Sequence, residues 1–243
     1  MNGDTLILLH GWGMNGRVFE PLLAQLPARQ SVVNPDLPGY GQSGWNAALD
    51  FDAQLAQMAE SLPAGRLLGW SMGGIYATEL AARYPAKFSE LILVCSNPCF
   101  VKRDDWSCAV AAEVFDRFGE ELAAGWQVTL RRFLSLQMLG ESGARGLIRS
   151  LSQHIAEAGA PDSELLNKGL DLLKHSDTRA LLGQLQMPVR VILGERDALV
   201  PIALKQQISD LHPGIRVESL AGAAHAPFLS HSGEFAALLQ APY

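Results

Sequence analysis

Short, uninterrupted runs of apolar residues recur along the first hundred residues of the chain. Each run is followed within a few positions by glycine or proline, and none alternates polar with apolar residues. Continuous apolar runs closed by turn residues are typical of strands that are buried on both faces of a parallel sheet. We therefore expect strands at residues 6–9, 32–33, 67–68 and 91–94.

Apolar residues between these runs recur every three or four positions, which is the spacing of amphipathic helices. Helices are expected over residues 19–26, from Asp50 as the capping residue to Leu62, and from Gly74 to Arg83. Strands that alternate with helices favour a parallel sheet with helices on both faces.

The alternation stops after Pro98 and returns near residue 189. Only helical spacing is found between about 104 and 182, over residues 113–118, 120–139, 144–158 and 163–173. A strand at 189–193, a helix at 201–211, a strand at 215–220 and a helix at 232–239 then complete the chain. We predict an α/β core from residues 1–97 and 183–243, with residues 98–182 inserted as a helical lid.

Composition places the chain among ordinary soluble globular proteins. It has 243 residues, of which 48% are hydrophobic and 18% charged, and its formal net charge is −6. An acidic balance gives no reason to expect nucleic acid or an anionic membrane as a partner. No apolar run approaches the ~18 residues of a membrane span, and no signal-peptide pattern is visible. We expect a cytoplasmic protein.

The three cysteines are Cys95, Cys99 and Cys108. Their spacing matches neither a disulfide framework nor a metal site that shares histidine ligands. We expect reduced, buried thiols, no bound metal and no cysteine nucleophile.

The third apolar run leads directly into GWSMG at residues 69–73, and a helical pattern follows. This pentapeptide matches G-x-S-x-G, in which a serine sits on a sharp strand-to-helix turn and glycines let the backbone pass close by. The helix that follows supplies backbone N–H groups and a dipole that favours negative charge. Ser71 is therefore the predicted nucleophile.

A serine hydroxyl needs a base, and the base needs an acid to orient it. His225 lies in the small-residue loop after the last predicted strand, at the sheet edge where Ser71 is also expected. Asp197 follows the strand at 189–193, whereas Glu195 comes earlier in that turn and is expected to point elsewhere. The order serine, aspartate, histidine is that of α/β-hydrolases. The sequence predicts Ser71, Asp197 and His225 as a catalytic triad.

An acyl-transfer site also needs donors for the oxyanion. We expect them to be the backbone N–H groups of Met72, which follows the nucleophile, and Trp12, in the loop after the first strand. His10 is expected to brace that loop, and residues 36–44 to shape the rim of the site. The remaining histidines are assigned structural or surface roles: His154, His175, His212 and His231, the last as a packing or capping residue.

Six segments together resemble the pimeloyl-[acyl-carrier protein] methyl ester esterases of biotin synthesis, within the α/β-hydrolase superfamily. They are HGWGMN, GWSMGG, CSNPCF, RRFLSLQ, LGERDALVP and AAHAPFLSH. The resemblance covers essentially the whole chain and implies hydrolysis of a methyl ester on an acyl chain carried by acyl carrier protein, without cofactor or metal. It implies these substrate-binding residues: Trp12, Ser71, Met72, Phe133, Leu134, Ser135, Leu136, Gln137 and His225.

The chain departs from that family at its start. The family has an N-terminal hairpin before the HGWG strand, whereas HGWG begins here at residue 10. We expect the hairpin to be shortened or absent, with a consequence for the sheet edge and none for the triad.

Four arginines concentrate positive charge in the predicted lid: Arg131, Arg132, Arg145 and Arg149. Because acyl carrier protein is strongly acidic, Arg132, Arg145 and Arg149 are candidates for its docking site. The alternative is a solvated helical face paired with Glu141 and Glu157. We expect the protein to act as a monomer.

Other functions remain open at this point. A short-chain carboxylesterase or a hydrolase of carbon–carbon bonds would share the triad and fold. A small-molecule receptor on the same fold is the non-enzymatic alternative.

Overall fold

A computed structural model describes residues 5–139, 141, 143–157 and 162–243. Its centre is a sheet of parallel strands in the order β2-β1-β3-β4-β5-β6. The strands are β1 (Leu6–Leu9), β2 (Val32–Val33), β3 (Gly65–Trp70), β4 (Phe88–Val94), β5 (Val189–Gly194) and β6 (Ile215–Leu220). The parallel sheet and all six predicted strands are confirmed.

Two strands begin earlier than their apolar runs. β3 starts at Gly65 and β4 at Phe88, so both include a charged residue. Arg66 Nε donates to Glu90 Oε2 at 2.6 Å across the two strands. A paired charge can lie inside a sheet, and a pattern of apolar residues cannot detect it.

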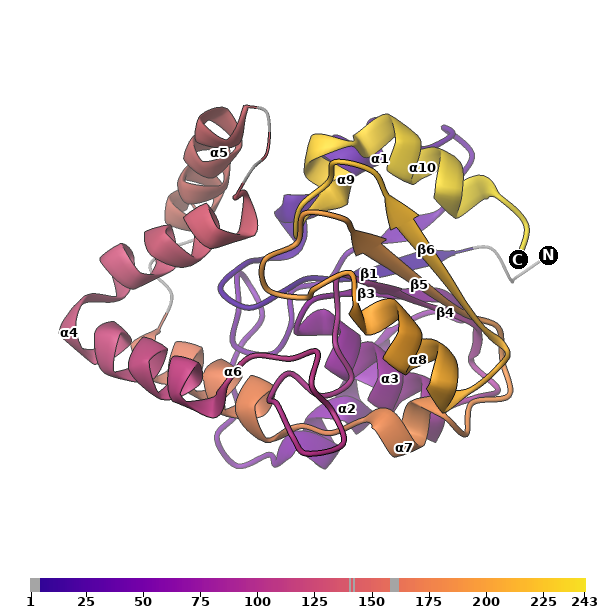
Figure 1. Ribbon diagram of the computed structural model, residues 1–243, viewed down its shortest axis with the longest axis horizontal. Coiled ribbons are helices and arrows are strands. Elements are labelled where there is room, and N and C mark those ends of the chain that lie inside the picture. The colour runs from indigo at the N-terminus through magenta and orange to yellow at the C-terminus, as the bar shows by residue number, and fades with distance from the viewer. Residues whose placement is uncertain (1–4, 140, 142, 158–161) are drawn as a thin grey trace.

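Helices cover both faces of the sheet, as the alternation predicted (Figure 1). One face carries α1 (Glu20–Leu23), α9 (Pro227–Ser230) and α10 (Ser232–Gln240). The other carries α2 (Phe51–Ser61), α3 (Gly73–Arg83), α7 (Arg179–Leu182) and α8 (Leu204–Leu211). Asp50 caps α2 as expected, because its side chain accepts from the Ala53 amide at 2.8 Å. The helix expected over 19–26 is shorter at both ends, since Phe19 belongs to a 3₁₀ turn at Gly16–Phe19 and the chain leaves the helix after Leu23.

Three longer helices stand beyond the carboxyl ends of the strands: α4 (Ala112–Gln137), α5 (Ala144–Glu157) and α6 (Ser163–His175). α4 joins two predicted helices, and its backbone leaves helical geometry at Gly125. Residues 98–111 form a loop with two isolated bridges, Val101 to Val110 and Arg103 to Trp106. We refer to α4, α5 and α6 with their connections as the lid.

The apolar core lies between the sheet and its helices, and it continues under the lid. Trp12, Trp70 and Arg190 are among the largest side chains that are fully buried. The guanidinium of Arg190 donates through Nη1 and Nη2 to the carbonyls of Leu238 and Ala241, and its Nε lies 3.3 Å from Glu90 Oε1. Among the described residues, no helix has the length and apolar character needed to cross a membrane.

Candidate active site

Ser71 occupies the two-residue turn between the end of β3 and the start of α3. Its φ is 54°, a left-handed conformation that costs a non-glycine residue free energy. The turn is tight enough to require glycine on either side. A Cβ on Gly69 would lie 2.4 Å from the Gly73 carbonyl oxygen, and one on Gly73 would lie 2.3 Å from the Leu9 oxygen. The backbone therefore holds the serine at the carboxyl end of the sheet, as the G-x-S-x-G pattern predicts.

His225 and Asp197 come together from loops that are 28 residues apart in sequence. Asp197 Oδ2 lies 2.7 Å from His225 Nδ1, and Asp197 Oδ1 accepts from the amides of Leu199 and Val200. Both side chains are buried, with 1% of the histidine and none of the aspartate side chain exposed. A buried carboxylate with these partners fixes the ring so that Nδ1 carries the proton and Nε2 is the free base. Glu195 is exposed, so it points elsewhere, as expected.

The Nε2 atom of His225 is buried and accepts no hydrogen bond from any described group. Ser71 and His225 nevertheless line one cavity, and the serine hydroxyl can turn about its Cα–Cβ bond without moving the backbone. Catalytic hydrogen bonds in unliganded enzymes often tighten only when substrate binds. The arrangement leaves His225 Nε2 without a hydrogen-bond partner among the described groups, on a ring that lines the same cavity as Ser71.

That cavity has apolar walls and a volume of only about 40 Å³. Apart from Ser71 and His225, its lining consists of Phe100, Val110, Val114, Phe115, Phe118, Phe133, Leu170, Leu173 and Leu199. Pockets that enclose a small-molecule ligand usually measure roughly 300–1,000 Å³. A ligand of that kind therefore enters this cavity only when wall side chains turn aside.

Trp12 and Met72 carry the two backbone N–H groups that are predicted to hold the oxyanion. Within the described part of the chain, the backbone N–H of neither residue is used in a hydrogen bond. The Trp12 ring has a separate role: Nε1 donates to the Leu166 carbonyl of α6 at 2.8 Å, and the ring meets Phe133 of α4 edge-on. The loop after β1 is thus fixed against two lid helices.

The five consecutive residues expected to bind substrate do not all reach the cavity. Phe133 lines it together with Ser71 and His225, whereas Leu134 lines a separate cavity between α4 and α5. Ser135 is exposed and donates to the Arg131 carbonyl, and Leu136 is half-buried. Gln137 is fully buried. Its backbone oxygen accepts from the His225 amide, and its side-chain amide has no partner among the described groups.

His10 braces the loop that carries Trp12, as expected. Its ring lies 2.9 Å from the Gly11 carbonyl through Nδ1, and its Nε2 accepts from the Leu37 amide. Burial lowers the pKa of His10 to about 4, so the ring is neutral. Asp36 accepts from the amides of Gly16 and Gln42, which ties the rim loop to the loop after β1.

The other histidines lie outside the cavity lining. His175 is exposed at the end of α6, and the His212 ring accepts from the Gly214 amide. The His231 ring pairs with the Ser230 hydroxyl and makes no side-chain cap to α10. The side chain of His154 lies outside the described residues.

Cys95 lies directly beneath the predicted triad. Its sulfur, the Asp197 carboxylate and a ring nitrogen of His225 are all within 4.8 Å of one another. Burial, followed by the charge of Asp197, raises the pKa of the Cys95 thiol well above its usual value, so the thiol stays protonated. Because His225 Nδ1 is already bonded to Asp197, this group is a packed support for the triad and a poor metal site.

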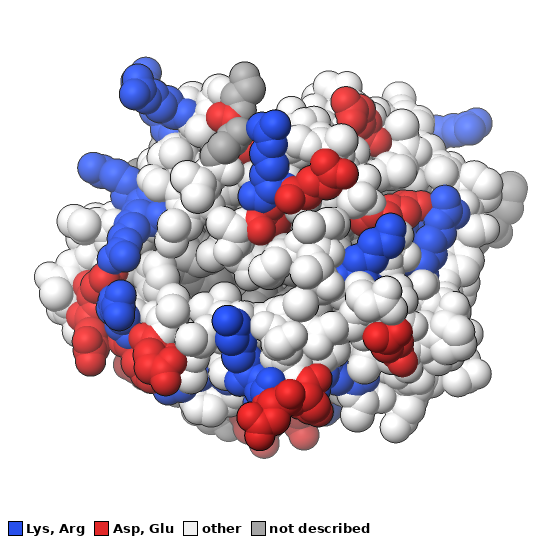
Figure 2. All heavy atoms as spheres, viewed as in Figure 1, with Lys and Arg blue, Asp and Glu red and all other residues white. Residues whose placement is uncertain are grey.

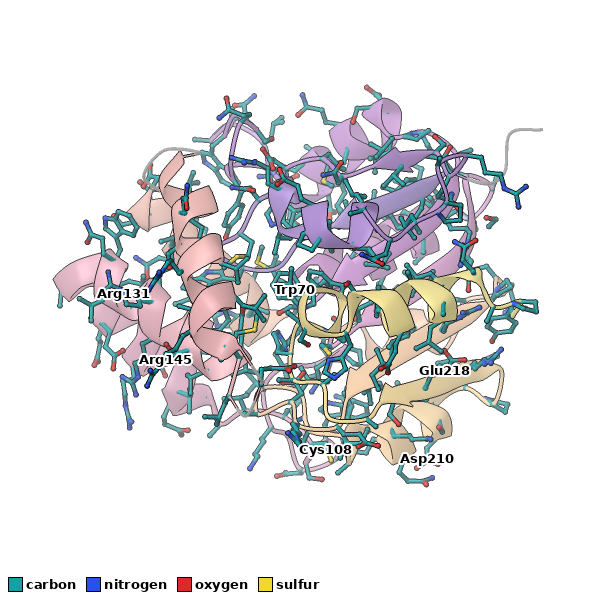
Figure 3. The ribbon with its side chains drawn as sticks, turned by 90° about the horizontal axis from the view of Figure 1, so that it is seen from above. Trp70, Cys108, Arg131, Arg145, Asp210 and Glu218 are labelled. Atoms are coloured by element: carbon teal, nitrogen blue, oxygen red, sulfur yellow. The ribbon has the colours of Figure 1, made fainter. Side chains whose placement is uncertain are left out.

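The lid arginines are exposed, but their expected acidic partners differ from those observed. Arg132 pairs with Glu121 at 2.5 Å. Glu141 contacts the loop that carries His225, and the side chain of Glu157 lies outside the described residues. Figure 2 shows several Lys and Arg side chains on the lid side of the molecule, with acidic side chains near them and other basic ones elsewhere on this face, and Figure 3 labels Arg131 and Arg145 on the lid, away from Trp70 at the centre.

The sequence did not identify most of the residues that line the cavity. Phe115 and Phe118 belong to the apolar stripe of α4, and Leu170 and Leu173 to that of α6. Apolar residues that pack against a core and apolar residues that line a pocket have the same spacing along a helix. Only the tertiary structure shows which of the two roles a residue has.

Comparison with known proteins agrees with this architecture. A family model described as the alpha/beta hydrolase fold matches residues 4–232. A pimeloyl-[acyl-carrier protein] methyl ester esterase from Xanthomonas oryzae is 39% identical over 98% of this chain and 94% of its own. A protein of the same name from Klebsiella pneumoniae is 39% identical over 96% of this chain and 91% of its own. Another from Aeromonas hydrophila is 38% identical over 98% of this chain and 94% of its own.

Solved structures share the fold at lower sequence identity. An esterase from Exiguobacterium antarcticum superposes with a TM-score of 0.88 at 22% identity, covering 98% of this chain and 91% of its own. A bromoperoxidase from Bacillus anthracis gives a TM-score of 0.85 at 21% identity, covering 98% and 90%.

Proposed function

The chain belongs to the pimeloyl-[acyl-carrier protein] methyl ester esterases of the alpha/beta hydrolase family, and we propose that it hydrolyses the methyl ester of pimeloyl-acyl carrier protein. The products are pimeloyl-acyl carrier protein and methanol, and the reaction serves biotin synthesis. The observation that carries the proposal is the buried Asp197–His225 pair, whose histidine lines an apolar cavity together with Ser71.

The first step is acylation of Ser71. The Ser71 hydroxyl attacks the ester carbonyl while His225 Nε2 removes its proton, and the oxyanion is held by the amides of Met72 and Trp12. The carbon–oxygen bond to the methoxy group then breaks, and His225 returns the proton so that methanol leaves. Asp197 stabilises the imidazolium that exists between these two proton transfers.

The second step is hydrolysis of the acyl-serine. Water attacks the same carbonyl, His225 removes a proton from that water, and the bond to Ser71 Oγ breaks as the serine regains its proton. The carbon–oxygen bond that forms belongs to the new carboxylic acid, which then loses its proton to water. The atoms of both products come from the ester and water, and Ser71 and His225 are regenerated.

The cavity wall suits the substrate's hydrocarbon chain. Its lining beyond Ser71 and His225 offers no charged side chain, so a neutral methyl ester and its methylenes bind without the cost of burying a free carboxylate. The same wall disfavours the charged product. Phe133 contacts both Trp12 and the cavity, which makes it the member of the 133–137 segment best placed to contact the chain.

The lid arginines are proposed to dock the carrier. Arg132, Arg145 and Arg149 are exposed in a protein with a net charge of −6, so their field is local to the lid. Charges of this kind raise association rates with an acidic partner. The pairing of Arg132 with Glu121 reduces its share of that field.

The proposal includes a cytoplasmic location and a monomeric enzyme. The three cysteines form no disulfide, which is consistent with a reducing compartment. All three predicted triad residues come from one chain, so a second copy is not needed to complete the site. Gel filtration with light scattering measures the oligomeric state directly.

The test compares the wild type with Ser71→Ala on two substrates, pimeloyl-acyl carrier protein methyl ester and an aryl acetate. Carrier-ester turnover by the wild type that exceeds aryl acetate turnover in kcat/KM supports the proposal, and loss of both in Ser71→Ala supports the nucleophile. Preference for the aryl acetate would favour a general carboxylesterase. A wild type that hydrolyses neither and resists a fluorophosphonate probe would favour the receptor.

A further inference from the structure

The lid holds the loop that carries His225 at two adjacent backbone positions. The loop runs from residue 221 to 226, between β6 and α9. The His225 amide donates to the Gln137 carbonyl at 3.2 Å, and the Ala224 amide donates to Glu141 Oε1 at 2.5 Å. Both acceptors come from the end of α4 and the turn that follows it.

Glu141 also binds α9, the short helix that follows this loop. The Ser230 hydroxyl donates to Glu141 Oε1 at 2.7 Å and is paired with the His231 ring at 2.8 Å. One carboxylate oxygen therefore joins the residue before His225 to the last residue of α9. Hydrogen bonds to an ionised acceptor are shorter and stronger than those between neutral groups.

Glu141 is absent from the lining of the cavity, so its effect on the reaction is indirect. The His225 ring is held by Asp197 on one side, and the His225 carbonyl accepts from Trp70. The Glu141 contact at the neighbouring residue fixes where the loop backbone can lie. A displacement of about 1 Å at a catalytic group can cost roughly a hundredfold in rate.

We propose that Glu141 is a positioning residue, through which the lid sets the place of His225 by accepting the Ala224 amide. This inference rests on the proposed function, because it assigns His225 as the base. It gives the lid a part in the chemistry besides enclosing the substrate, since the same element that covers the cavity fixes the base.

The experiment compares Glu141→Ala, Glu141→Gln and the matched control Glu120→Ala, an exposed glutamate of α4. An aryl acetate is the substrate, so carrier docking is not involved. We expect Glu141→Ala to lower kcat by about tenfold to a hundredfold with KM within about twofold of wild type. Glu141→Gln keeps an oxygen that can accept from both donors, and it should recover most of that loss. Glu120→Ala should match the wild type.

Amide hydrogen exchange gives a second readout that does not depend on activity. In the wild type, the Ala224 and His225 amides should exchange slowly although they lie in a loop. Glu141→Gln should preserve the protection at Ala224, and Glu141→Ala should lose it. If Glu141→Ala fails to fold, the wild type and Glu141→Gln still give the exchange result.

Three results would overturn the inference: kcat of Glu141→Ala equal to that of Glu120→Ala, no recovery in Glu141→Gln, or fast exchange at Ala224 in the wild type. Failure of the proposed function looks different. It is seen as a wild type that prefers the aryl acetate to the carrier ester, or as Ser71→Ala retaining turnover, whatever the Glu141 variants do.

Discussion

The indole nitrogen of Trp70 donates a 2.8 Å hydrogen bond to the carbonyl oxygen of His225. The residue before the predicted nucleophile thus holds the backbone of the predicted base. The two rings are 5.8 Å apart, and Trp70 also packs edge-on against Phe228. The link joins the strand that presents Ser71 to the loop that presents His225.

Trp70→Phe keeps an aromatic ring and removes this hydrogen bond. A single hydrogen bond contributes about 1 kcal/mol, and the buried His225 carbonyl would lose its donor. We expect kcat on an aryl acetate to fall about tenfold, with the fold retained by circular dichroism. Trp45→Phe, at a half-buried site outside the cavity lining, is the matched control and should have no effect. Equal rates in the two variants would remove this role from Trp70.

Ser71→Ala should abolish turnover and labelling by a fluorophosphonate, while the protein still folds. Removing the nucleophile of a triad costs about 10⁴-fold to 10⁶-fold in kcat. The checks are steady-state kinetics, probe labelling and thermal unfolding. Turnover within a hundredfold of wild type would require another nucleophile.

Asp197→Asn should lower kcat about 10⁴-fold, because the amide nitrogen can donate to His225 and favour the wrong ring tautomer. The remaining side-chain oxygen can still accept hydrogen bonds from the amides of Leu199 and Val200, so the fold should survive. Glu195→Gln, an exposed change in the same turn, is the control. Retained activity in Asp197→Asn would point to a different orienting group.

Neutralising Arg145 and Arg149 to glutamine should weaken the reaction with carrier-bound ester at low salt and leave an aryl acetate unaffected. The expected change is a severalfold rise in KM that shrinks as salt is added, since surface attraction is screened. Arg29 and Lys205, exposed on the core, provide a control with the same change in charge. Equal loss on both substrates would contradict docking by the lid arginines.

His10 makes stability depend on pH below neutrality. Burial lowers its pKa from 6.5 to about 4, so between these values the unfolded chain binds a proton that the folded chain does not. Stability therefore falls as pH drops from 6.5 toward 4, by up to about 3 kcal/mol in total. His10→Gln should flatten this part of the curve, measured as the free energy of unfolding in urea at several pH values. An unchanged slope would show that other groups cause the decline.

Sequence alone predicts the six strands and the approach of Ser71, Asp197 and His225, because both rest on local rules. Buried parallel strands are continuous apolar runs, and loops at their carboxyl ends share one edge of the sheet. No such rule predicts that Glu141 accepts a hydrogen bond from the Ala224 amide. A glutamate in a lid turn can face solvent, an arginine or a distant backbone amide, and the choice is made by how α4 lies on the core.

The same limit applies to the segment 133–137. Its residues are consecutive on a helix, so their side chains point in successive directions about 100° apart. Phe133 therefore faces the cavity while Ser135 faces solvent. A motif identifies the segment that approaches a ligand, and helix geometry decides which of its members reach it.

The left-handed backbone at Ser71 carries a cost that selection for heat resistance would expose. Glycine adopts a positive φ without this steric cost. The simplest substitution that stabilises the turn, Ser71→Gly, therefore also removes the hydroxyl. Directed evolution that selects only for stability at high temperature would favour Ser71→Gly, and the selected protein would lack the predicted nucleophile. Libraries built for a more durable enzyme should hold position 71 constant and seek their gains elsewhere.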